Sequence, residues 1–558
     1  MSMITTSAWV RRGVAAQFPT KYEINEEEMD RISKLARMQL EEAQGDLKAA
    51  QEDEEMEEDK KEGADDAMED DSKEEEEEKK KEGADDAMED DSKEEEEEKK
   101  KEGAADDDDD LKEYDLDHYD SDEVDEDGEK ITMFGNVKSL AYHQPNEEDP
   151  YLVMPPEEED EEREELQIMP TDNLLLAGKV EDEVAHLEVY VYEDAADNLY
   201  VHHDIMLPAI PLALEWLDIP VGKTAEGRTT GNFVAIGTME PDIEIWDLDV
   251  VDSMYPNAIL GQGGADAENG AKKSKKKKAK ANDEYHIDSI LALAANRQHR
   301  NLLASGSADR TVKLWDLQTT KCAKSYSHHT DKVCALEWHP TESTVLLSGS
   351  YDRTVVAADM RAPDSKARWG VDADVENVRW DVHDPNYFYV TTDAGMVYRY
   401  DVRNIPASPK ESKPVWTLQA HDSSVSSFDV NPTVPGYLVT GSTDKSVKLW
   451  NIENDKPSMV VSRKMEVGKI FSTTFAPDAD VSFRLAVAGS KGVVQIWDTS
   501  TNAAVRRAFV SRVPTLEGEV QERLVGIQPD QDESDEEEGV QEVGAAQGAD
   551  GWESMDED

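Results

Sequence analysis

Histidine, hydroxyl and aspartate side chains occur in this sequence in an order that could perform nucleophilic catalysis. Two sets of four residues share the order histidine, hydroxyl, aspartate and tryptophan. They are His286, Ser305, Asp309 and Trp315 in the first set, and His421, Thr440, Asp444 and Trp450 in the second. A hydroxyl activated by a histidine, which an aspartate orients, is the arrangement of a hydrolase triad. The repetition of the whole set favours a structural role instead.

The same four residue types can satisfy one another in a protein interior. A buried indole N–H, a hydroxyl, an imidazole and a carboxylate in a turn can form one hydrogen-bond chain, and buried polar groups need such partners. Two other stretches hold incomplete sets, with Ala358 at the tryptophan position of one and Lys491 at the aspartate position of the other. We therefore interpret the two complete sets as structural.

No other residue pattern indicates an enzyme or a metal site. Cys322 and Cys334 lie 12 positions apart without the companion pairs that a zinc site needs. Glycines between 261 and 264 lie in a polar linker, not between a strand and a helix, so they do not form a dinucleotide loop. We expect no catalytic residue, no metal, no cofactor and no small-molecule substrate.

The polar sets lie within a repeat of short β-runs, most of which end in an aromatic residue and aspartate. The runs are IEIWD (243–247), VKLWD (312–316), VVAAD (355–359), VYRYD (397–401), VKLWN (447–451) and VQIWD (494–498), with a weaker unit upstream at LEVYVYE (187–193). The last five of the six strong runs lie 42 to 50 residues apart, which is the period of one four-stranded propeller blade. The repeat predicts an all-β fold, a seven-bladed WD-repeat β-propeller, whose closed ring leaves no exposed sheet edge.

The sequence leaves open how this ring closes. Residues 131–142 could supply a strand to the last blade or belong to the first blade. Residues 504–510 compete for the same edge.

Charge divides the chain into a propeller and disordered acidic N- and C-terminal arms. The formal net charge is −69, of which residues 1–170 carry about −43 and residues 511–558 about −14. Such polyanionic stretches bury too little apolar surface to offset chain entropy. The predicted organisation is a docking segment with a short helix at 1–40, a disordered acidic arm at 41–130, the propeller at 131–512 and an acidic tail at 513–558. Within the propeller we expect an acidic insert at 157–165 and a lysine-rich insert at 252–284.

Two stretches resemble a known family. The sequence MITTSAWVRRGVAAQFPTKYEINEEEMDRISKLARMQL (3–40) is similar to the N-terminus of the periodic tryptophan protein 1 family, and PTDNLLLAGKVEDEVAHLEVYVYE (170–193) resembles that family's first blade. The resemblance implies a nucleolar WD-repeat protein that acts in large (60S) ribosomal subunit biogenesis and pre-rRNA processing. It implies pre-60S particles, ribosome-assembly factors and ribosomal proteins as partners, pre-rRNA as a further candidate, the nucleus and nucleolus as location, and no membrane.

Two other functions fit parts of the sequence. Acidic arms suit any basic partner, so a chromatin or histone-binding protein is one alternative. Asp359-Met360-Arg361 and Asp401-Val402-Arg403 resemble the Asp-x-Arg boxes of WD-repeat substrate receptors of cullin ubiquitin ligases, which is the second alternative. The N-terminal resemblance favours ribosome assembly over both.

The first 40 residues hold an apolar cluster that is predicted to bind a partner. Asn25 and Glu28 have the spacing of a helix N-cap and its capping-box partner, and apolar residues follow on one helical face. We expect this segment to fold on a partner protein, with packing on the propeller's own rim as the alternative. The predicted docking residues are Trp9, Val10, Arg11, Arg12, Tyr22, Met29, Ile32 and Leu35.

Three further groups are candidates for contact or modification. Cations that each follow a turn aspartate are predicted to contact RNA phosphates from one rim; they are Arg310, Arg353 and Lys445. A basic run is predicted to direct nuclear import; it comprises Lys272, Lys273, Lys275, Lys276, Lys277, Lys278 and Lys280. Serines in acidic surroundings are predicted phosphorylation sites; they are Ser72, Ser92 and Ser534.

Overall fold

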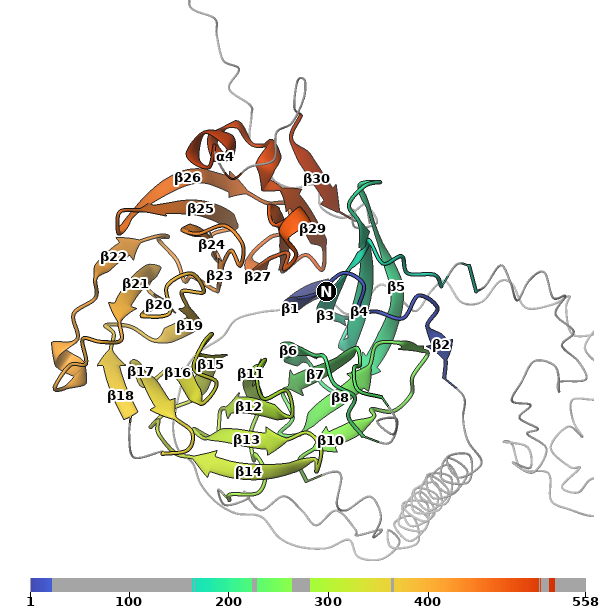
Figure 1. Ribbon diagram of the computed structural model, residues 1–558, viewed down its shortest axis with the longest axis horizontal. Coiled ribbons are helices and arrows are strands. Elements are labelled where there is room, and N and C mark those ends of the chain that lie inside the picture. The colour runs from blue at the N-terminus through green and yellow to red at the C-terminus, as the bar shows by residue number, and fades with distance from the viewer. Residues whose placement is uncertain are drawn as a thin grey trace, which may run out of the picture. The chain divides into compact units, whose positions relative to one another are not determined.

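The computed structural model describes residues 2–22, 163–164, 166–222, 228–262, 282–362, 366–510, 512 and 521–526. Within these ranges, seven four-stranded antiparallel sheets are arranged radially in a ring (Figure 1). The prediction of a seven-bladed propeller is confirmed. The expected acidic arm at 41–130 and the segment at 131–142 lie outside the described residues, as do 263–281 and 527–558.

Each blade runs from an innermost first strand to an outermost fourth strand. Blade 1 comprises β1 (Ser2–Val10), β3 (Asn173–Glu181), β4 (Val184–Glu193) and β5 (Asn198–Leu207), and blade 2 comprises β6 (Pro211–Leu217), β7 (Phe233–Thr238), β8 (Ile243–Asp247) and β10 (Ala258–Leu260). Blade 3 comprises β11 (Ile290–Ala295), β12 (Leu302–Ser307), β13 (Val312–Asp316) and β14 (Lys321–Tyr326), and blade 4 comprises β15 (Val333–Trp338), β16 (Val345–Ser350), β17 (Thr354–Asp359) and β18 (Lys366–Gly370).

Blades 5 to 7 follow the same order. Blade 5 comprises β19 (Val375–Trp380), β20 (Tyr387–Thr392), β21 (Met396–Asp401) and β22 (Trp416–Gln419). Blade 6 comprises β23 (Ser427–Val430), β24 (Tyr437–Gly441), β25 (Ser446–Glu453) and β26 (Lys456–Lys464), and blade 7 comprises β27 (Ile470–Phe475), β28 (Arg484–Gly489), β29 (Val494–Asp498) and β30 (Arg523–Gly526). The remaining elements are a parallel pair, β2 (Thr20–Lys21) with β9 (Val250–Val251), the short helices η5 (Pro409–Glu411), η6 (Ala479–Val481) and η7 (Thr499–Thr501), and α4 (Ala503–Ala508).

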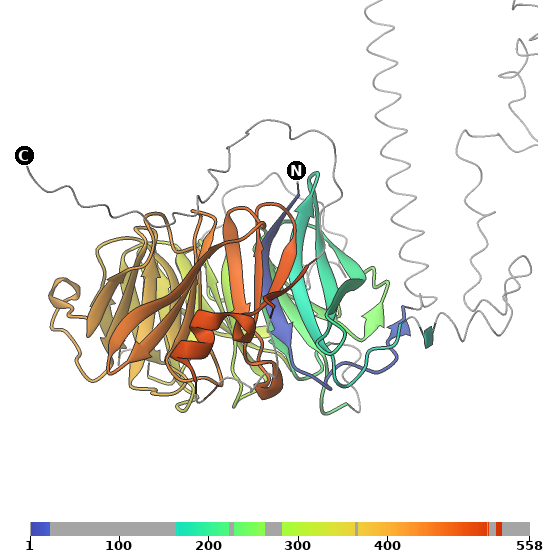
Figure 2. The ribbon, with the colours of Figure 1, turned by 90° about the horizontal axis from the view of Figure 1, so that it is seen from above.

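The ring has two faces, which Figure 2 shows edge-on. The connections between the second and third strands of each blade lie on one face, here called the hairpin face. The connections between the first and second strands lie on the opposite face, here called the loop face. Antiparallel strand order fixes this division, because successive connections alternate between the two ends of the strands.

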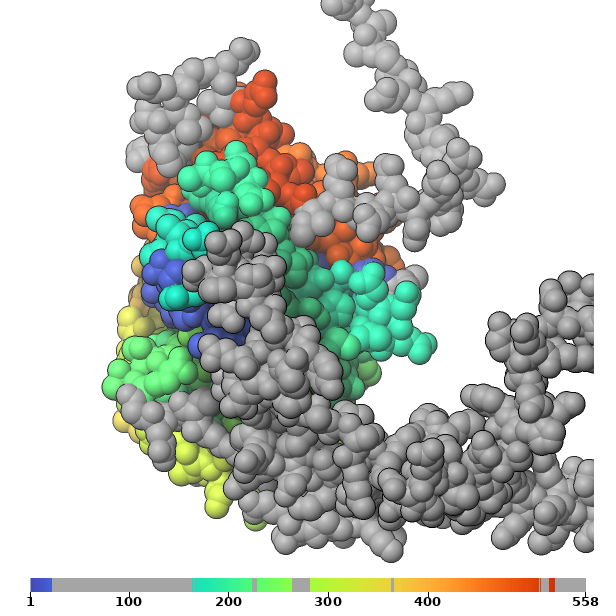
Figure 3. All heavy atoms as spheres, turned by 90° about the vertical axis from the view of Figure 1, so that its right-hand side faces the viewer, coloured from blue at the N-terminus to red at the C-terminus, as the bar shows by residue number. Residues whose placement is uncertain are grey.

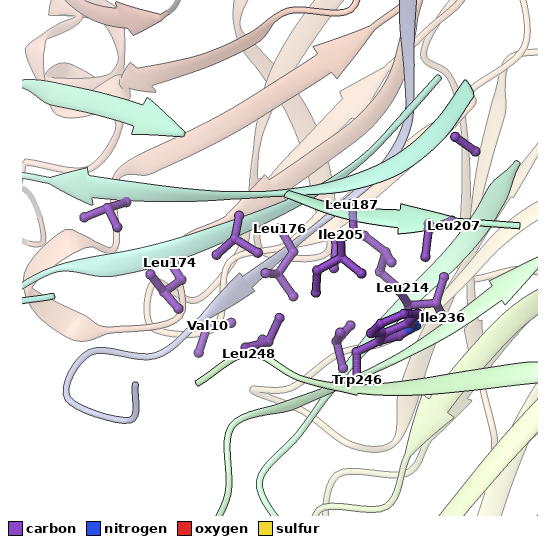
Figure 4. Close-up of a cluster of buried hydrophobic side chains, with 14 of the residues drawn as sticks. Val10, Leu174, Leu176, Leu187, Ile205, Leu207, Leu214, Ile236, Trp246 and Leu248 are labelled. Carbon is purple, nitrogen blue, oxygen red and sulfur yellow. The ribbon is translucent and has the colours of Figure 1, made fainter. Parts of the chain in front are cut away.

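Apolar residues pack between neighbouring blades. The second strands are buried on both sides, and all six residues of β7 are buried. Between blades 1 and 2, Val10, Leu176 and Leu214 pack with Trp246 of β8, which is 2% exposed (Figure 4). Truncation of such a buried tryptophan typically costs about 3–5 kcal/mol, so these inter-blade clusters are a main source of the ring's stability.

The innermost strand of blade 1 comes from the extreme N-terminus. β1 pairs antiparallel with β3, with Trp9 opposite Leu175 and Val10 opposite Leu174. Val10 is fully buried, and its carbonyl accepts a hydrogen bond from Asn173, 163 positions away. The prediction of a docking segment apart from the propeller is therefore wrong for residues 2–22, which form part of the ring. The alternative of packing on the propeller itself describes them better.

The last blade is also completed by residues that were expected to lie outside it. β30 (Arg523–Gly526) pairs with β29, although 513–558 was predicted to be an acidic tail. Most of the 504–510 stretch, the predicted competitor for the ring's edge, lies in helix α4. The expected lysine-rich insert at 252–284 includes strand β10 of blade 2. Short strands in charged surroundings give little local signal, which explains these boundary errors.

A polar network joins the two ends of the ring. Asp194, in the turn between β4 and β5, pairs with Arg484 of blade 7 at 2.7 Å and with Arg12 at 3.8 Å. Arg12 Nε also donates to Asn173 Oδ1 at 2.8 Å, and Asn173 Nδ2 donates to Asp478 Oδ2 at 2.8 Å. This network, here called the seam, ties the N-terminal strand, blade 1 and blade 7 together.

Candidate interaction surfaces

In blades 3 and 6, the four residues of each polar set form a continuous hydrogen-bond chain. In blade 3, His286 Nδ1 lies 2.8 Å from Asp309 Oδ2 and His286 Nε2 lies 2.7 Å from Ser305 Oγ. Trp315 Nε1 donates to Ser305 Oγ at 2.8 Å. The corresponding distances in blade 6, among His421, Asp444, Thr440 and Trp450, are 2.9, 2.8 and 2.9 Å.

Burial determines what these groups can do. Ser305 is fully buried and accepts the Trp315 N–H, so no substrate atom can approach its hydroxyl. Burial lowers the pKa of His286, although Asp309 opposes that shift. Burial would raise the pKa of Asp309, but hydrogen bonds from His286 and Thr311 outweigh it and lower that pKa to about 2. The set thus holds a neutral imidazole and an ionised carboxylate, an arrangement that fixes the hairpin to its strand.

Blade 4 holds the incomplete version of this set. His329 Nδ1 lies 3.1 Å from Asp352 Oδ2, and its Nε2 lies 2.8 Å from Ser348 Oγ. Ala358 stands where the third strand would supply a tryptophan, so no indole N–H donates to Ser348 Oγ, which lies 3.3 Å from the carbonyl oxygen of Val356.

The predicted RNA-contact residues lie on the hairpin face. Arg310, Arg353 and Lys445 are exposed and have positive φ values of 71°, 63° and 68°. Gly395 and Gly492 take the positive-φ position in the hairpins of blades 5 and 7. The turn requires this left-handed conformation, which costs a residue with a side chain more than glycine. An arginine or a lysine at these turns is therefore less favourable for stability than a glycine would be.

The predicted docking residues of the described N-terminus have other contacts within the chain. Trp9 Nε1 donates to the Thr474 carbonyl of blade 7 at 3.0 Å, and the Tyr22 backbone N–H donates to Val251. Val10 is buried and Arg12 belongs to the seam, whereas Arg11 is exposed. Figure 3 shows the N-terminal residues, in blue, against the turquoise residues of blade 1. The prediction that Trp9, Val10 and Arg12 are docking residues for a partner is therefore corrected, because these residues make their contacts within the ring.

Arg11 instead lines a cavity of 960 Å³ on the loop face. Three further arginines from loops of blades 2 and 3 line it with Trp9 and Trp216; they are Arg228, Arg297 and Arg300. Arg228, Arg297 and Arg300 each pair with a nearby carboxylate, at 2.9, 2.7 and 2.7 Å respectively. The sequence did not predict this cluster, because its members lie in separate loops without a shared motif.

The other predicted site residues lie outside the described residues. They are Met29, Ile32 and Leu35 of the docking helix, the lysines of 272–280, and Ser72, Ser92 and Ser534. In the described part of the chain, no group of three or more histidine, cysteine, aspartate or glutamate residues is placed to hold a metal ion. The helices described there are too short or too polar to span a membrane.

Comparison with known proteins gives a consistent result. The WD domain, G-beta repeat, matches residues 283–316, 320–356 and 412–451. The chain is 48% identical over 530 residues to a WD repeat-containing protein of Schizosaccharomyces pombe, covering 95% of each. It is 36% identical over 574 residues to periodic tryptophan protein 1 of Saccharomyces cerevisiae, covering 94% of this chain and 93% of that protein. It is 31% identical over 380 residues to the periodic tryptophan protein 1 homolog of Drosophila melanogaster, covering 67% and 77%.

Proposed function

Since the chain belongs to the periodic tryptophan protein 1 family of WD-repeat proteins, we propose that it is a non-catalytic scaffold in 60S ribosomal subunit biogenesis and pre-rRNA processing. The observation that carries the proposal is the similarity to the Saccharomyces cerevisiae protein, which spans 94% of this chain. Single WD repeats are shared by unrelated proteins and carry no function by themselves. Similarity over nearly the full length is far more specific.

The propeller offers the surfaces that a scaffold needs. Its repeated histidine–hydroxyl–aspartate sets are internally satisfied, so the exposed loops of the two faces remain for contacts with partners. The acidic stretches complement basic ribosomal proteins and assembly factors, because opposite charge favours association. In this proposal Arg310, Arg353 and Lys445 contact pre-rRNA phosphates, and the lysines of 272–280 direct the chain to the nucleus and nucleolus.

Sedimentation of the tagged full-length protein tests the proposal. We expect it to migrate with nucleolar pre-60S particles and to recover precursors of large-subunit rRNA. Replacement of Arg310, Arg353 and Lys445 by glutamate is expected to reduce RNA recovery at low salt, because phosphate contacts are salt-dependent. Lys456→Glu, at an exposed turn of the loop face, is the matched control. Migration with nucleosomes instead of pre-ribosomal particles would favour the chromatin alternative.

Residues 23–40 remain a proposed docking segment. The double substitution Ile32→Asp with Leu35→Asp is designed to remove the apolar face of the predicted helix without touching β1. We expect it to weaken particle association while the circular dichroism spectrum stays unchanged. Full recovery of the variant on the particles would eliminate the docking role of this segment.

The ubiquitin-ligase alternative rests on the two Asp-x-Arg motifs alone. Arg361 pairs with Asp359 at 2.9 Å, and Arg403 pairs with Asp401 at 2.8 Å. Each guanidinium is thus oriented by the aspartate of its own motif. Co-purification with a cullin adaptor that is lost on Arg361→Ala with Arg403→Ala would favour this alternative.

A further inference from the structure

The interface between blades 3 and 4 lacks the third-strand aromatic residue that most other interfaces of the ring contain. A buried aromatic residue of the third strand packs against the preceding blade at most positions of the ring. These residues are Trp246, Trp315, Tyr400, Trp450 and Trp497. In blade 4 the equivalent residue is Ala358, which belongs to a cluster with Ala294, Ala304, Leu346 and Trp338. The third-strand position of this interface thus carries a methyl group where the other blades carry a large ring.

A cavity of 550 Å³ lies at this same interface on the loop face. Its walls include Leu302 and Leu314 of blade 3 with Trp338 and Met360 of blade 4. Trp338 enters from the first strand and donates its indole N–H to the Ala294 carbonyl at 2.9 Å. This indole occupies part of the space next to Ala358, but an apolar opening remains.

Two cationic side chains lie at the rim of the cavity. Lys324 is exposed, and the Arg361 side chain is 74% exposed. Among the described residues, the lining contains no aspartate or glutamate. Asp359 binds the Nε and Nη2 atoms of Arg361 at 3.2 and 2.9 Å, which orients the guanidinium and leaves its Nη1 atom for another acceptor.

We propose that this cavity binds an acidic peptide segment of a partner protein. An aromatic or large aliphatic side chain of the peptide inserts between Leu314, Trp338 and Met360, and its flanking carboxylates pair with Lys324 and Arg361. Partial burial of the anchor supplies affinity, and the charges supply orientation and rate of association. A nucleic-acid strand fits less well, because Trp338 is only 9% exposed and offers no open ring face for stacking. The inference goes beyond the role in ribosome assembly and does not depend on it.

Binding of a synthetic peptide to the full-length protein tests the proposal. The probe is a fluorescein-labelled peptide with one tryptophan between four aspartate and glutamate residues, measured by fluorescence anisotropy. We expect saturable binding that weakens at least tenfold when alanine replaces the tryptophan, and also when amides replace the carboxylates. Equal binding of all three peptides would overturn the proposal.

Variants of the cavity locate the binding. Ala358→Trp restores the residue type of the other blades, and Ala323→Trp blocks the entrance from an exposed position of β14, away from the core. Each is expected to weaken binding of the probe at least tenfold. Lys324→Glu with Arg361→Glu should have a similar effect at low salt, whereas the exposed Lys332→Glu on the hairpin face should have none. Unchanged affinity of a folded Ala323→Trp protein would refute the site.

Two other occupants produce distinct outcomes. If this chain's own C-terminal tail filled the cavity, Trp552→Ala in the full-length protein would raise the probe's affinity several-fold. If nucleic acid were the ligand, a single-stranded oligonucleotide would displace the probe completely from the wild-type protein. At high probe concentration, the same oligonucleotide would not displace the probe from the Lys324→Glu/Arg361→Glu variant. Either result would overturn the assignment to an acidic partner peptide.

Discussion

Blade 6 and blade 1 are held together by different kinds of contact. Blade 6 is built from one continuous stretch, and its polar set of His421, Thr440, Asp444 and Trp450 lies within that stretch and the connection that leads into it. Blade 1 is built from two stretches, and its polar contacts form the seam between distant parts of the chain. In a repeated blade, the buried polar groups therefore find hydrogen-bond partners nearby in the sequence. The polar groups that close the ring find theirs only when distant parts of the chain have folded together.

Deletion of residues 2–10 is expected to have the largest effect. It removes a strand that contains the fully buried Ile4 and Val10 and exposes the edge of β3. We expect a loss of more than about 5 kcal/mol, comparable with the whole stability of many domains. Thermal unfolding followed by circular dichroism measures it. Deletion of residues 23–40, which leaves β1 in place, is the control, and equal melting temperatures for both deletions would disprove closure by β1.

Trp450→Ala is expected to destabilise the protein by about 3–5 kcal/mol, because it leaves a cavity between blades 5 and 6 and removes the donor to Thr440. Trp9→Ala in blade 1 should cost less, because the Trp9 ring is only partly buried. Urea unfolding of both variants gives the comparison. If Trp9→Ala lowered the free energy of unfolding more than Trp450→Ala does, contacts at the closure of the ring would contribute more to stability than packing between the repeated blades.

His421→Ala is expected to cost about 1–3 kcal/mol, because it removes one hydrogen-bond partner each from Asp444 and Thr440 in a buried chain. Asp194→Ala at the seam should cost about 1 kcal/mol or less at moderate salt, because its ion pairs are partly exposed. The two effects differ in salt dependence, since only the seam is screened. Urea midpoints at low and high salt measure this difference, and a salt-sensitive His421→Ala effect would contradict the assignment.

The last effect depends on pH. The pKa of Asp309 is lowered to about 2 by its hydrogen bonds, so its stabilising contribution is present above about pH 4 and is lost as the pH falls toward 2. Asp309→Asn should therefore be less stable than the wild type by about 1–2 kcal/mol at pH 7, and this difference should shrink below pH 4. Denaturation at both pH values measures it, and a constant difference would exclude the titration of Asp309 as its cause.

The sequence predicted the blades well because each blade is local. The aromatic–aspartate runs and the spacing of His286, Ser305 and Asp309 lie within one blade, so a short window contains the signal. The role of Ser2–Val10 could not be predicted in this way, because the Val10 carbonyl is bound by Asn173, 163 positions away, and no local pattern reports such a contact. The arginines of the loop-face cavity escaped prediction for the same reason. They come together only when loops of neighbouring blades meet.

Because β1 belongs to blade 1, the residues on either side of the segment 23–162 are both fixed to the ring. There, the Arg163 guanidinium lies 4.6 Å above the ring of Phe18, and the Ile168 N–H donates to the Gln17 carbonyl at 3.0 Å. A single proteolytic cut between residues 23 and 162 would therefore leave β1 attached to the propeller by non-covalent contacts alone.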